Sequence, residues 1–245
     1  MTMLKNILGR ILAFWALITF IATFFIIYIP SMICWLIPGP RGQYIFISIA
    51  KGWMSTWLYL VGCPFRIKGK ENFKKGNTYI VCCNHNSMLD VPLSSPFIPG
   101  PNKTIAKTSF SKIPIFGFYY MKGAVLVDRK SDKSRWQSFE KMKHVLSSGM
   151  HMCIYPEGTR NRTTAPLKKF HDGAFKLAKE SGKSIIPAVI LNTKKVLPVN
   201  KTFCFWPGKI EMHFLPAIPV DGLTSDQLKE KVFATIAGYY LENNS

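Results

Sequence analysis

The chain has 245 residues, a length that supports one or two domains with a sizeable core. Hydrophobic residues make up 48% and charged residues 18% of it, a balance that excludes an intrinsically disordered protein. The six cysteines are too few for a disulfide scaffold, and none forms the C-x-x-C pair typical of zinc modules. The net charge of +19 predicts a phosphate-bearing partner, whether nucleic acid, anionic lipid or a phosphorylated substrate.

The first sixty residues have the composition of a segment that contacts a membrane. No charge occurs over residues 11–40, and residues 11–29 would form a helix of about 28 Å, the thickness of a bilayer's hydrocarbon core. Pro30 is expected to kink or end this helix. A second apolar segment, 44–61, carries a single charge, Lys51, and is rich in the aromatic residues that suit a membrane interface.

Three arrangements of this segment are open. A cleaved signal peptide fits poorly, because the apolar run is long and no small-residue cleavage motif follows it. A single span would place Lys5 and Arg10 opposite Arg41 and the later cations, against the positive-inside rule. A helical hairpin or interfacial pair within one leaflet keeps every cation on the cytoplasmic side. There, the attraction between each cation and the anionic headgroups contributes about 1 kcal/mol to membrane binding. We therefore expect a membrane-associated helical hairpin over residues 1–62 and a second domain over 63–245.

Beyond Cys63 the sequence changes to short apolar strands that alternate with helices. We expect strands over residues 64–70, 78–83, 104–107, 124–127, 150–155 and 185–191. We expect helices over residues 87–97, 114–121, 131–146, 171–180 and 223–241. The helix over 131–146 would carry one apolar stripe made of Trp136, Phe139, Met142, Val145 and Leu146. The alternation predicts an α/β fold, with a largely parallel sheet flanked by helices.

One polar cluster follows the buried strand over 78–83 and opens the next helix. It contains His85 and Asp90, which would diverge by about 140° on a continuous helix. They can meet only if His85 lies in the turn and Asp90 in the first helical turn, with Ser87 as the N-cap. A carboxylate there would fix the imidazole tautomer and leave the other ring nitrogen able to take a proton. Alternatively, Ser87 and Asp90 form a capping box that serves only the helix start.

Two more clusters follow strands, at the sheet edge where α/β proteins usually bind ligands. In residues 155–160, Gly158 permits close backbone approach to a ligand, and Arg160 offers a bidentate fork for phosphate. The other interpretation of this segment is an ordinary turn built on proline and glycine. Lys107 and Arg129 each end a strand, where they either converge on an anion or remain solvated surface charges.

Other chemistries lack their sequence patterns. No G-x-S-x-G motif occurs, which leaves a serine hydrolase of the nucleophile-elbow type unsupported. The tripeptide 182–184 resembles the end of a P-loop, but Leu177 stands where the first glycine is required. The five histidines show no metal-ligand spacing, so no metal site is expected.

Together these clusters resemble the motifs of the glycerolipid acyltransferases, specifically the 1-acyl-sn-glycerol-3-phosphate (lysophosphatidic acid) acyltransferases. The family's motif N-H-x-S-x-x-D is matched by Asn84, His85, Ser87 and Asp90. A second motif is similar to Lys107-x-x-Phe110-x-x-Ile113-Pro114-x-x-Gly117 and ends in Val127-Asp128-Arg129, although the family more often has leucine in place of Phe110.

Two further motifs extend the resemblance, so that four in family order cover roughly residues 80–190. The family's F-P-E-G-T-R-S resembles residues 155–161, with Tyr155 in place of phenylalanine and Asn161 in place of serine. Its apolar strand with a proline is similar to residues 186–189. The basic, apolar N-terminal segment also fits the family.

The resemblance implies transfer of a fatty acyl group from a thioester, acyl-CoA or acyl-carrier protein, to the free hydroxyl of 1-acyl-sn-glycerol-3-phosphate, giving phosphatidic acid. In that case His85 is the general base, Asp90 orients the imidazole, and backbone amides at the helix start stabilise the oxyanion. Residues 63–245 are then the catalytic domain, on the cytoplasmic face of a membrane. Substrate binding is assigned to Lys107, Arg129, Glu157, Gly158, Thr159 and Arg160.

No cofactor, metal or covalent enzyme intermediate is required by this chemistry. The expected partners are the lysophospholipid, the acyl thioester and an anionic membrane surface, and not nucleic acid. Four alternatives stay open: another lyso-lipid acceptor, a non-catalytic lipid-binding protein, a phosphate-ester hydrolase that uses His85, and a nucleic-acid binder. The last explains the charge but not the apolar first sixty residues. The aromatic segment 200–219 could line an acyl tunnel, but we expect it to be ordinary core.

Overall fold

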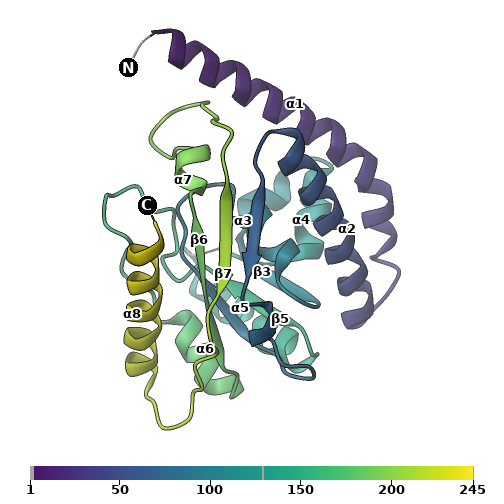
Figure 1. Cartoon of the computed structure of the whole chain (residues 1–245). Helices are drawn as coiled ribbons and strands as arrows, with labels where there is room; N and C mark the ends of the chain where they lie inside the picture. The colour runs from purple at the N-terminus through teal and green to yellow at the C-terminus, as the bar shows by residue number, and fades with distance from the viewer. Residues whose placement is uncertain (1–2, 129, 245) are drawn as a thin grey trace.

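The computed structural model describes residues 3–128 and 130–244 and centres on a seven-stranded sheet of order β1-β7-β6-β2-β5-β3-β4 (Figure 1). Strands β2 to β6 are parallel, whereas β7 runs antiparallel to β6 and parallel to β1. The strands are β1 (Phe65–Lys68), β2 (Ile80–Cys83), β3 (Asn102–Lys107), β4 (Ala124–Val127), β5 (His151–Ile154), β6 (Ile185–Leu191) and β7 (Ile210–Phe214). The predicted α/β fold with a largely parallel sheet is therefore confirmed.

Helices cover both faces of the sheet, which explains why its central strands are buried at every position and almost entirely apolar. One face packs on α5 (Asp132–Ser147), α6 (Gly173–Ser181) and α8 (Ser225–Asn243), and the other on α2 (Gly39–Leu60) and α3 (Asp90–Ser94). Successive residues of β2 alternate between the two cores, as the pleat of a strand requires. The shorter elements are α4 (Phe116–Gly123), α7 (Thr193–Val196) and the 3₁₀ turns η1 (Lys70–Asn72), η2 (Ser95–Phe97) and η3 (Thr108–Lys112).

Most predicted elements are present, and two strands have the expected bounds, β4 and β6. The sequence analysis gave no element to the segment 200–219, which contains β7. Phe205 and Phe214 there are buried core, as expected, whereas Phe203 is exposed. The predicted stripe on α5 is wrong at Trp136, which is 67% exposed, because α5 buries Ser138 on the adjoining side.

The N-terminal residues form two packed helices, α1 (Met3–Ile33) and α2, joined by a short turn (Figure 1). Three indole N–H groups of the pair donate hydrogen bonds across it. Trp53 donates to the Thr23 hydroxyl at 2.8 Å, Trp57 to the Ala16 carbonyl at 3.2 Å and Trp15 to the Leu60 carbonyl at 3.4 Å. Pro30 does not end the helix, since α1 continues for three residues beyond it.

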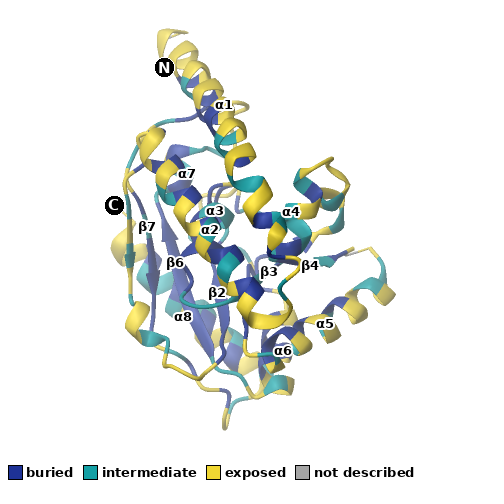
Figure 2. Cartoon of the chain, turned by 90° about the vertical axis from the view of Figure 1, so that its right-hand side faces the viewer, coloured by how far each residue is buried: buried dark blue, intermediate teal, exposed yellow. Residues whose placement is uncertain are grey.

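Helix α1 buries small side chains and exposes large apolar ones, the reverse of a helix in a water-soluble core. Its buried positions are mostly small: Gly9, Ala13, Ala16, Thr19, Phe24 and Ser31. Its exposed positions include Phe14, Phe25, Ile26 and Ile29, and Ile26 is 75% exposed. Figure 2 shows much of α1 coloured as exposed. By length and composition, α1 is the one helix of the described chain that could cross a membrane.

Helix α2, in contrast, belongs to the core of the sheet. Its Trp53, Met54, Trp57 and Leu58 share one cluster with β2, β5, β6 and β7. The Gln43 side chain donates a 2.7 Å hydrogen bond to the Asn102 carbonyl at the start of β3. The hairpin is therefore fixed to the sheet. The predicted boundary at residue 62 divides the chain by expected role, since residues on both sides of it share one hydrophobic core.

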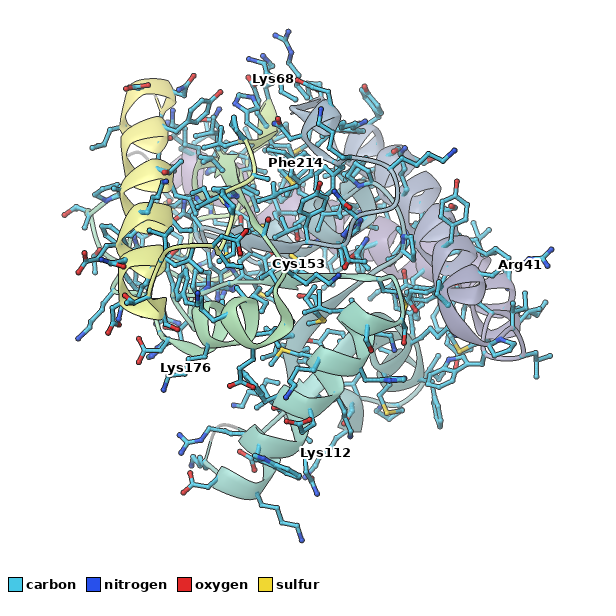
Figure 3. All side chains as sticks on the ribbon, turned by 90° about the horizontal axis from the view of Figure 1, so that it is seen from below. Arg41, Lys68, Lys112, Cys153, Lys176 and Phe214 are labelled. Atoms are coloured by element: carbon cyan, nitrogen blue, oxygen red, sulfur yellow. The ribbon has the colours of Figure 1, made fainter. Side chains whose placement is uncertain are left out.

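The edge of the sheet at which β5 begins contains a buried histidine. His151 is 6% exposed, accepts the Tyr79 N–H at Nδ1 over 3.0 Å and stacks on the Tyr79 ring with 5.7 Å between centroids. Burial lowers the pKa of His151 to about 4, because a charged imidazolium would lose its hydration there. The side chains around Cys153, two residues along β5, fill the centre of the molecule, whereas Arg41, Lys68 and Lys176 lie at its margin (Figure 3).

We expect the free energy of unfolding to fall as the pH drops below about 6.5, the pKa of an unfolded histidine. Between that pH and about 4, His151 is protonated in the unfolded chain and neutral in the folded one, so protons favour unfolding. The full loss is about 3 kcal/mol. Urea unfolding of the detergent-solubilised protein from pH 7 to 4 measures it. His151→Asn keeps an acceptor for the Tyr79 N–H and should remove this part of the slope; an unchanged slope would show that another group titrates.

Candidate active site

The residues that follow the parallel strands gather at one edge of the sheet. His85 comes after β2, Lys107 ends β3, and the segment 155–160 follows β5. Thr193 comes two residues after β6, which pairs with β2. Four segments that are distant in sequence therefore meet at this edge, and three of them carry the residues that the motifs single out.

The imidazole and the carboxylate of the first motif are in direct contact. His85 Nδ1 lies 2.9 Å from Asp90 Oδ2. The five-residue spacing is accommodated because His85 lies in the β2–α3 turn while Asp90 is the first residue of α3. The Asp90 side chain is completely buried, and that of His85 is 17% exposed. The predicted juxtaposition is thus present in the structure, with the ring accessible from solvent.

The buried carboxylate of Asp90 is surrounded by donors. Its Oδ2 also accepts the backbone N–H groups of Asn86 at 2.5 Å and Ser87 at 2.7 Å, and its Oδ1 accepts the Thr193 hydroxyl at 2.6 Å. A carboxylate saturated in this way is an acceptor toward the ring, which assigns the proton to His85 Nδ1 and the lone pair to Nε2. Among the described residues, Nε2 has no hydrogen-bonding partner.

The turn corrects two expectations about the helix start. Ser87 is not the N-cap of α3, which is Leu89; the Ser87 hydroxyl instead donates to the Leu197 carbonyl at 2.9 Å. The amides of Asn86 and Ser87 are occupied by Asp90, so they are not available to an oxyanion. Asp90 therefore both orders the turn and contacts the imidazole, whereas the capping box expected of Ser87 and Asp90 is not formed, because Ser87 does not cap α3.

The asparagine that opens the motif connects the turn to β6. Asn84 accepts the Ile190 N–H at 2.7 Å and donates to the Ile190 carbonyl at 2.9 Å, so its side chain extends the β2–β6 pairing past the end of β2. On the other side of the ring, Tyr155 packs against His85 with 4.4 Å between centroids. Burial raises the pKa of Tyr155, and its neutral hydroxyl is paired with that of Ser94 at 2.5 Å.

Glu157 accepts hydrogen bonds from two backbone amides. It is 1% exposed; its Oε1 accepts the His85 N–H at 2.7 Å and its Oε2 accepts the Lys168 N–H at 3.0 Å. Burial raises the pKa of Glu157, while these two amides favour its charged form. Because both oxygens are engaged, this carboxylate fixes the β2–α3 turn against the loop that follows β5.

The remaining predicted binding residues differ in position. Gly158 adopts φ +71° within a turn, where its N–H donates to the Tyr155 carbonyl at 3.0 Å, and a side chain at that φ would be strained. Thr159 is exposed and accepts the Lys168 ammonium at 2.6 Å. Arg160 is half-buried and Lys107 is exposed, and neither forms an ion pair with any described residue. Arg129 lies outside the described residues.

The sequence analysis missed Thr193 and Lys168. Thr193 follows the strand over 185–191, so the rule that places ligand-binding residues after parallel strands could have identified it. Lys168 lies eight residues beyond Arg160, where no strand or motif marks it. In the described part of the chain, no group of three His, Cys, Asp or Glu side chains is arranged to hold a metal ion.

Comparison with known proteins supplies the family. A family model described as Acyltransferase matches residues 64–191, more than half of the chain. The 1-acyl-sn-glycerol-3-phosphate acyltransferase of Borreliella burgdorferi is 30% identical over 181 residues, which cover 73% of this chain and 71% of that protein. The protein of the same name from Chlamydomonas reinhardtii is 29% identical over 188 residues, 75% of this chain.

The chain spans 56%, 60% and 66% of the length of three curated relatives that it matches, from C. reinhardtii, Homo sapiens and Saccharomyces cerevisiae. The fold also matches a crystal structure, that of the 1-acyl-sn-glycerophosphate (LPA) acyltransferase PlsC from Thermotoga maritima. The TM-score is 0.81 at 22% identity, and 97% of each chain is covered. With the matched motifs in place at the edge of a sheet of this fold, the chain belongs to the acyltransferase family.

Proposed function

We propose that this protein is a membrane-associated 1-acyl-sn-glycerol-3-phosphate acyltransferase. It transfers a fatty acyl group from acyl-CoA or acyl-carrier protein to the free hydroxyl of the lysophospholipid, giving phosphatidic acid. The observation that carries the proposal is the contact of 2.9 Å between His85 Nδ1 and Asp90 Oδ2 at the edge of the sheet. The names of the relatives support the acceptor, since B. burgdorferi and C. reinhardtii proteins of this similarity act on 1-acyl-sn-glycerol-3-phosphate.

The chemistry follows from the protonation state of the ring. His85 Nε2 removes the proton of the acceptor hydroxyl as its oxygen attacks the thioester carbonyl. Asp90 stabilises the imidazolium that forms, since its carboxylate faces Nδ1–H. When the tetrahedral intermediate collapses, the C–S bond breaks and the imidazolium returns its proton to the leaving thiolate. The ester oxygen is thus supplied by the lysophospholipid, and the enzyme leaves the cycle unchanged.

The acceptor's phosphate needs cations that the protein does not neutralise internally. Arg160 and Lys107 meet this condition, and we assign the phosphate to them, together with Arg129. Gly158 and Thr159 form the loop that presents Arg160, and Glu157 fixes that loop through backbone amides. Glu157 is therefore assigned to the site as a support of the loop and not as a contact of the phosphate.

The membrane supplies both acyl chains, and α1 is the element suited to enter it. Its large side chains point outward and its small ones face the protein, the pattern of a lipid-facing helix. Because α2 is built into the core of the sheet, α1 lies along the protein and does not leave it, which favours insertion into one leaflet. This arrangement keeps Lys5, Arg10 and Arg41 on the cytoplasmic face with the sheet.

The proposal is tested by thiol release from acyl-CoA and from acyl-carrier protein with a panel of lyso-lipid acceptors. His85→Ala should lower the rate by about 100- to 10,000-fold, the usual contribution of a general base, without loss of the fold. His144→Ala, an exposed histidine on α5, is the matched control and should keep full activity. Full activity in His85→Ala would remove the base assignment, and release of phosphate in place of thiol would identify a hydrolase.

Thr193 should affect turnover through Asp90. Thr193→Val has the same shape but no hydroxyl, so Asp90 Oδ1 loses a buried donor, a loss of about 1–3 kcal/mol. We expect kcat to fall about tenfold with little change in KM, and Thr193→Ser to restore it. Steady-state kinetics across pH separates this from a change in stability alone; a fall in thermal stability with unchanged kcat would contradict the positioning role.

Arg160 should matter for the acceptor more than for the acyl donor. We expect Arg160→Ala to raise the KM for 1-acyl-sn-glycerol-3-phosphate about 10- to 100-fold, the range for loss of a charged hydrogen bond. The exposed neighbour Arg162 provides the control, because Arg162→Ala removes the same charge two residues away. An unchanged acceptor KM in Arg160→Ala would show that the phosphate binds elsewhere.

A further inference from the structure

A second exposed apolar surface lies beside the catalytic edge, between β3 and β4. In the segment 110–118, which we call the apolar loop, four large side chains are exposed, each by more than a third. They are Phe110 (37%), Ile113 (44%), Ile115 (43%) and Phe118 (59%). The loop follows Lys107, the last residue of β3, so it stands at the same edge of the sheet as His85.

The apolar loop is held in one shape by its own backbone. The Gly117 N–H donates to the Ile113 carbonyl at 2.7 Å, and the Phe116 N–H donates to the Pro114 carbonyl at 2.6 Å. A Cβ on Gly117 would lie 2.2 Å from the Ser111 carbonyl oxygen, so the backbone around Gly117 packs closely against the backbone at Ser111. The exposed side chains are thus presented by an ordered structure.

The apolar loop is continuous with the N-terminal hairpin. Phe116 and Tyr119 pack against Phe24 of α1, with 5.7 and 5.4 Å between ring centroids. Tyr119 also contacts Phe46 and Trp53 of α2 at 4.8 and 5.8 Å. Figure 2 shows α4 directly beside α1, with exposed residues on the outer side of both. The exposed face of the loop therefore adjoins the exposed face of α1.

The charge around the apolar loop suits an anionic surface. Residues 91–127 contain no acidic residue and four lysines, at positions 103, 107, 112 and 122. Lys112 is exposed within the loop itself, next to Ile113. Lys107 is also exposed, whereas Lys103 is half-buried and Lys122 is buried and donates to the Cys34 carbonyl. An apolar surface with two exposed lysines, in a segment without carboxylates, matches a bilayer with anionic headgroups, because the apolar groups enter the lipid while the exposed cations stay at the headgroups.

We propose that the apolar loop is a second lipid-contacting surface, which inserts into the same leaflet as α1. The proposal rests on the proposed membrane association and adds a partner for residues 110–118. Because this enlarged surface adjoins the edge of the sheet that contains His85, its contact with lipid would hold His85 toward the leaflet, so that an acceptor with its acyl chain in the leaflet reaches Nε2. A second copy of the chain is the competing occupant.

The test uses the full chain in vesicles of phosphatidylcholine and phosphatidylglycerol, with an environment-sensitive fluorophore on one introduced cysteine. Selective labelling is feasible because the six native cysteines are buried. The probe position is Ile115→Cys. Ile26→Cys on α1 is the positive control, and Ser147→Cys, exposed at the end of α5 and at the opposite edge of the sheet, is the negative control.

We expect the label at position 115 to shift to shorter wavelength and to be protected from aqueous iodide to the extent seen at position 26. Iodide should reach the label at position 147 freely. Protection at 26 with full quenching at 115 would overturn the lipid contact while leaving membrane association intact. Quenching at both positions would overturn membrane association itself. Protection at 115 that disappears on dilution in detergent would identify a second copy of the chain.

A functional measurement supports the same distinction. In Ile115→Ser/Phe118→Ser, the KM for an acceptor embedded in vesicles should rise about tenfold or more, since two large apolar side chains no longer enter the lipid. Trp136→Ser removes an equally exposed aromatic residue from α5, outside this surface, and is the matched control. Equal KM values in the two variants, with both folded by circular dichroism, would contradict the proposal.

Discussion

The buried carboxylate of Asp90 is the constraint around which the catalytic edge is organised. An ionised side chain with no exposure is destabilising unless donors replace its hydration. Here those donors come from the imidazole of His85, two amides of the β2–α3 turn and the hydroxyl of Thr193. Thr193 reaches Asp90 only because β2 and β6 are adjacent and parallel, so the segments that follow both strands lie at the same edge. The environment of the Asp90 carboxylate therefore depends on the strand order of the sheet.

The same group of contacts connects the site to the N-terminal helix. The Ser87 hydroxyl donates to the Leu197 carbonyl, the Trp206 N–H donates to the Val196 carbonyl, and the Phe205 N–H donates to the carbonyl of Gly9 in α1. Gly9 permits this approach, because a Cβ there would lie 2.8 Å from the Cys204 sulfur. Helix α1 is thus connected by these hydrogen bonds to Ser87, whose backbone amide donates to Asp90. If α1 enters a leaflet as proposed, a helix attached in this way would fix the height of the imidazole relative to the lipid, which a flexible linker would not do.

Much of this arrangement could be read from the sequence, and the omissions have physical causes. β4 and β6 were predicted because continuous apolar runs mark strands buried on both faces. β7 was missed because it mixes apolar residues with Glu211 and His213, whose side chains are hydrogen-bonded to each other at 2.9 Å in the folded chain. The His85–Asp90 contact was predicted from spacing and motif, but Thr193 lies 103 residues from Asp90 and becomes its neighbour only through the pairing of β2 with β6.

The charge at the catalytic edge follows from where its carboxylates point. Asp90 and Glu157 are the buried acidic residues there, and both are saturated by donors of the turns that they hold. Neither forms an ion pair with Lys107 or Arg160, so these two cations are not neutralised by the buried carboxylates. A phosphate bound there as proposed would meet attraction that internal salt bridges would have reduced. The negative charge of Asp90 and Glu157 is thus kept inside the fold, and the positive charge that we assign to phosphate binding is left outside it.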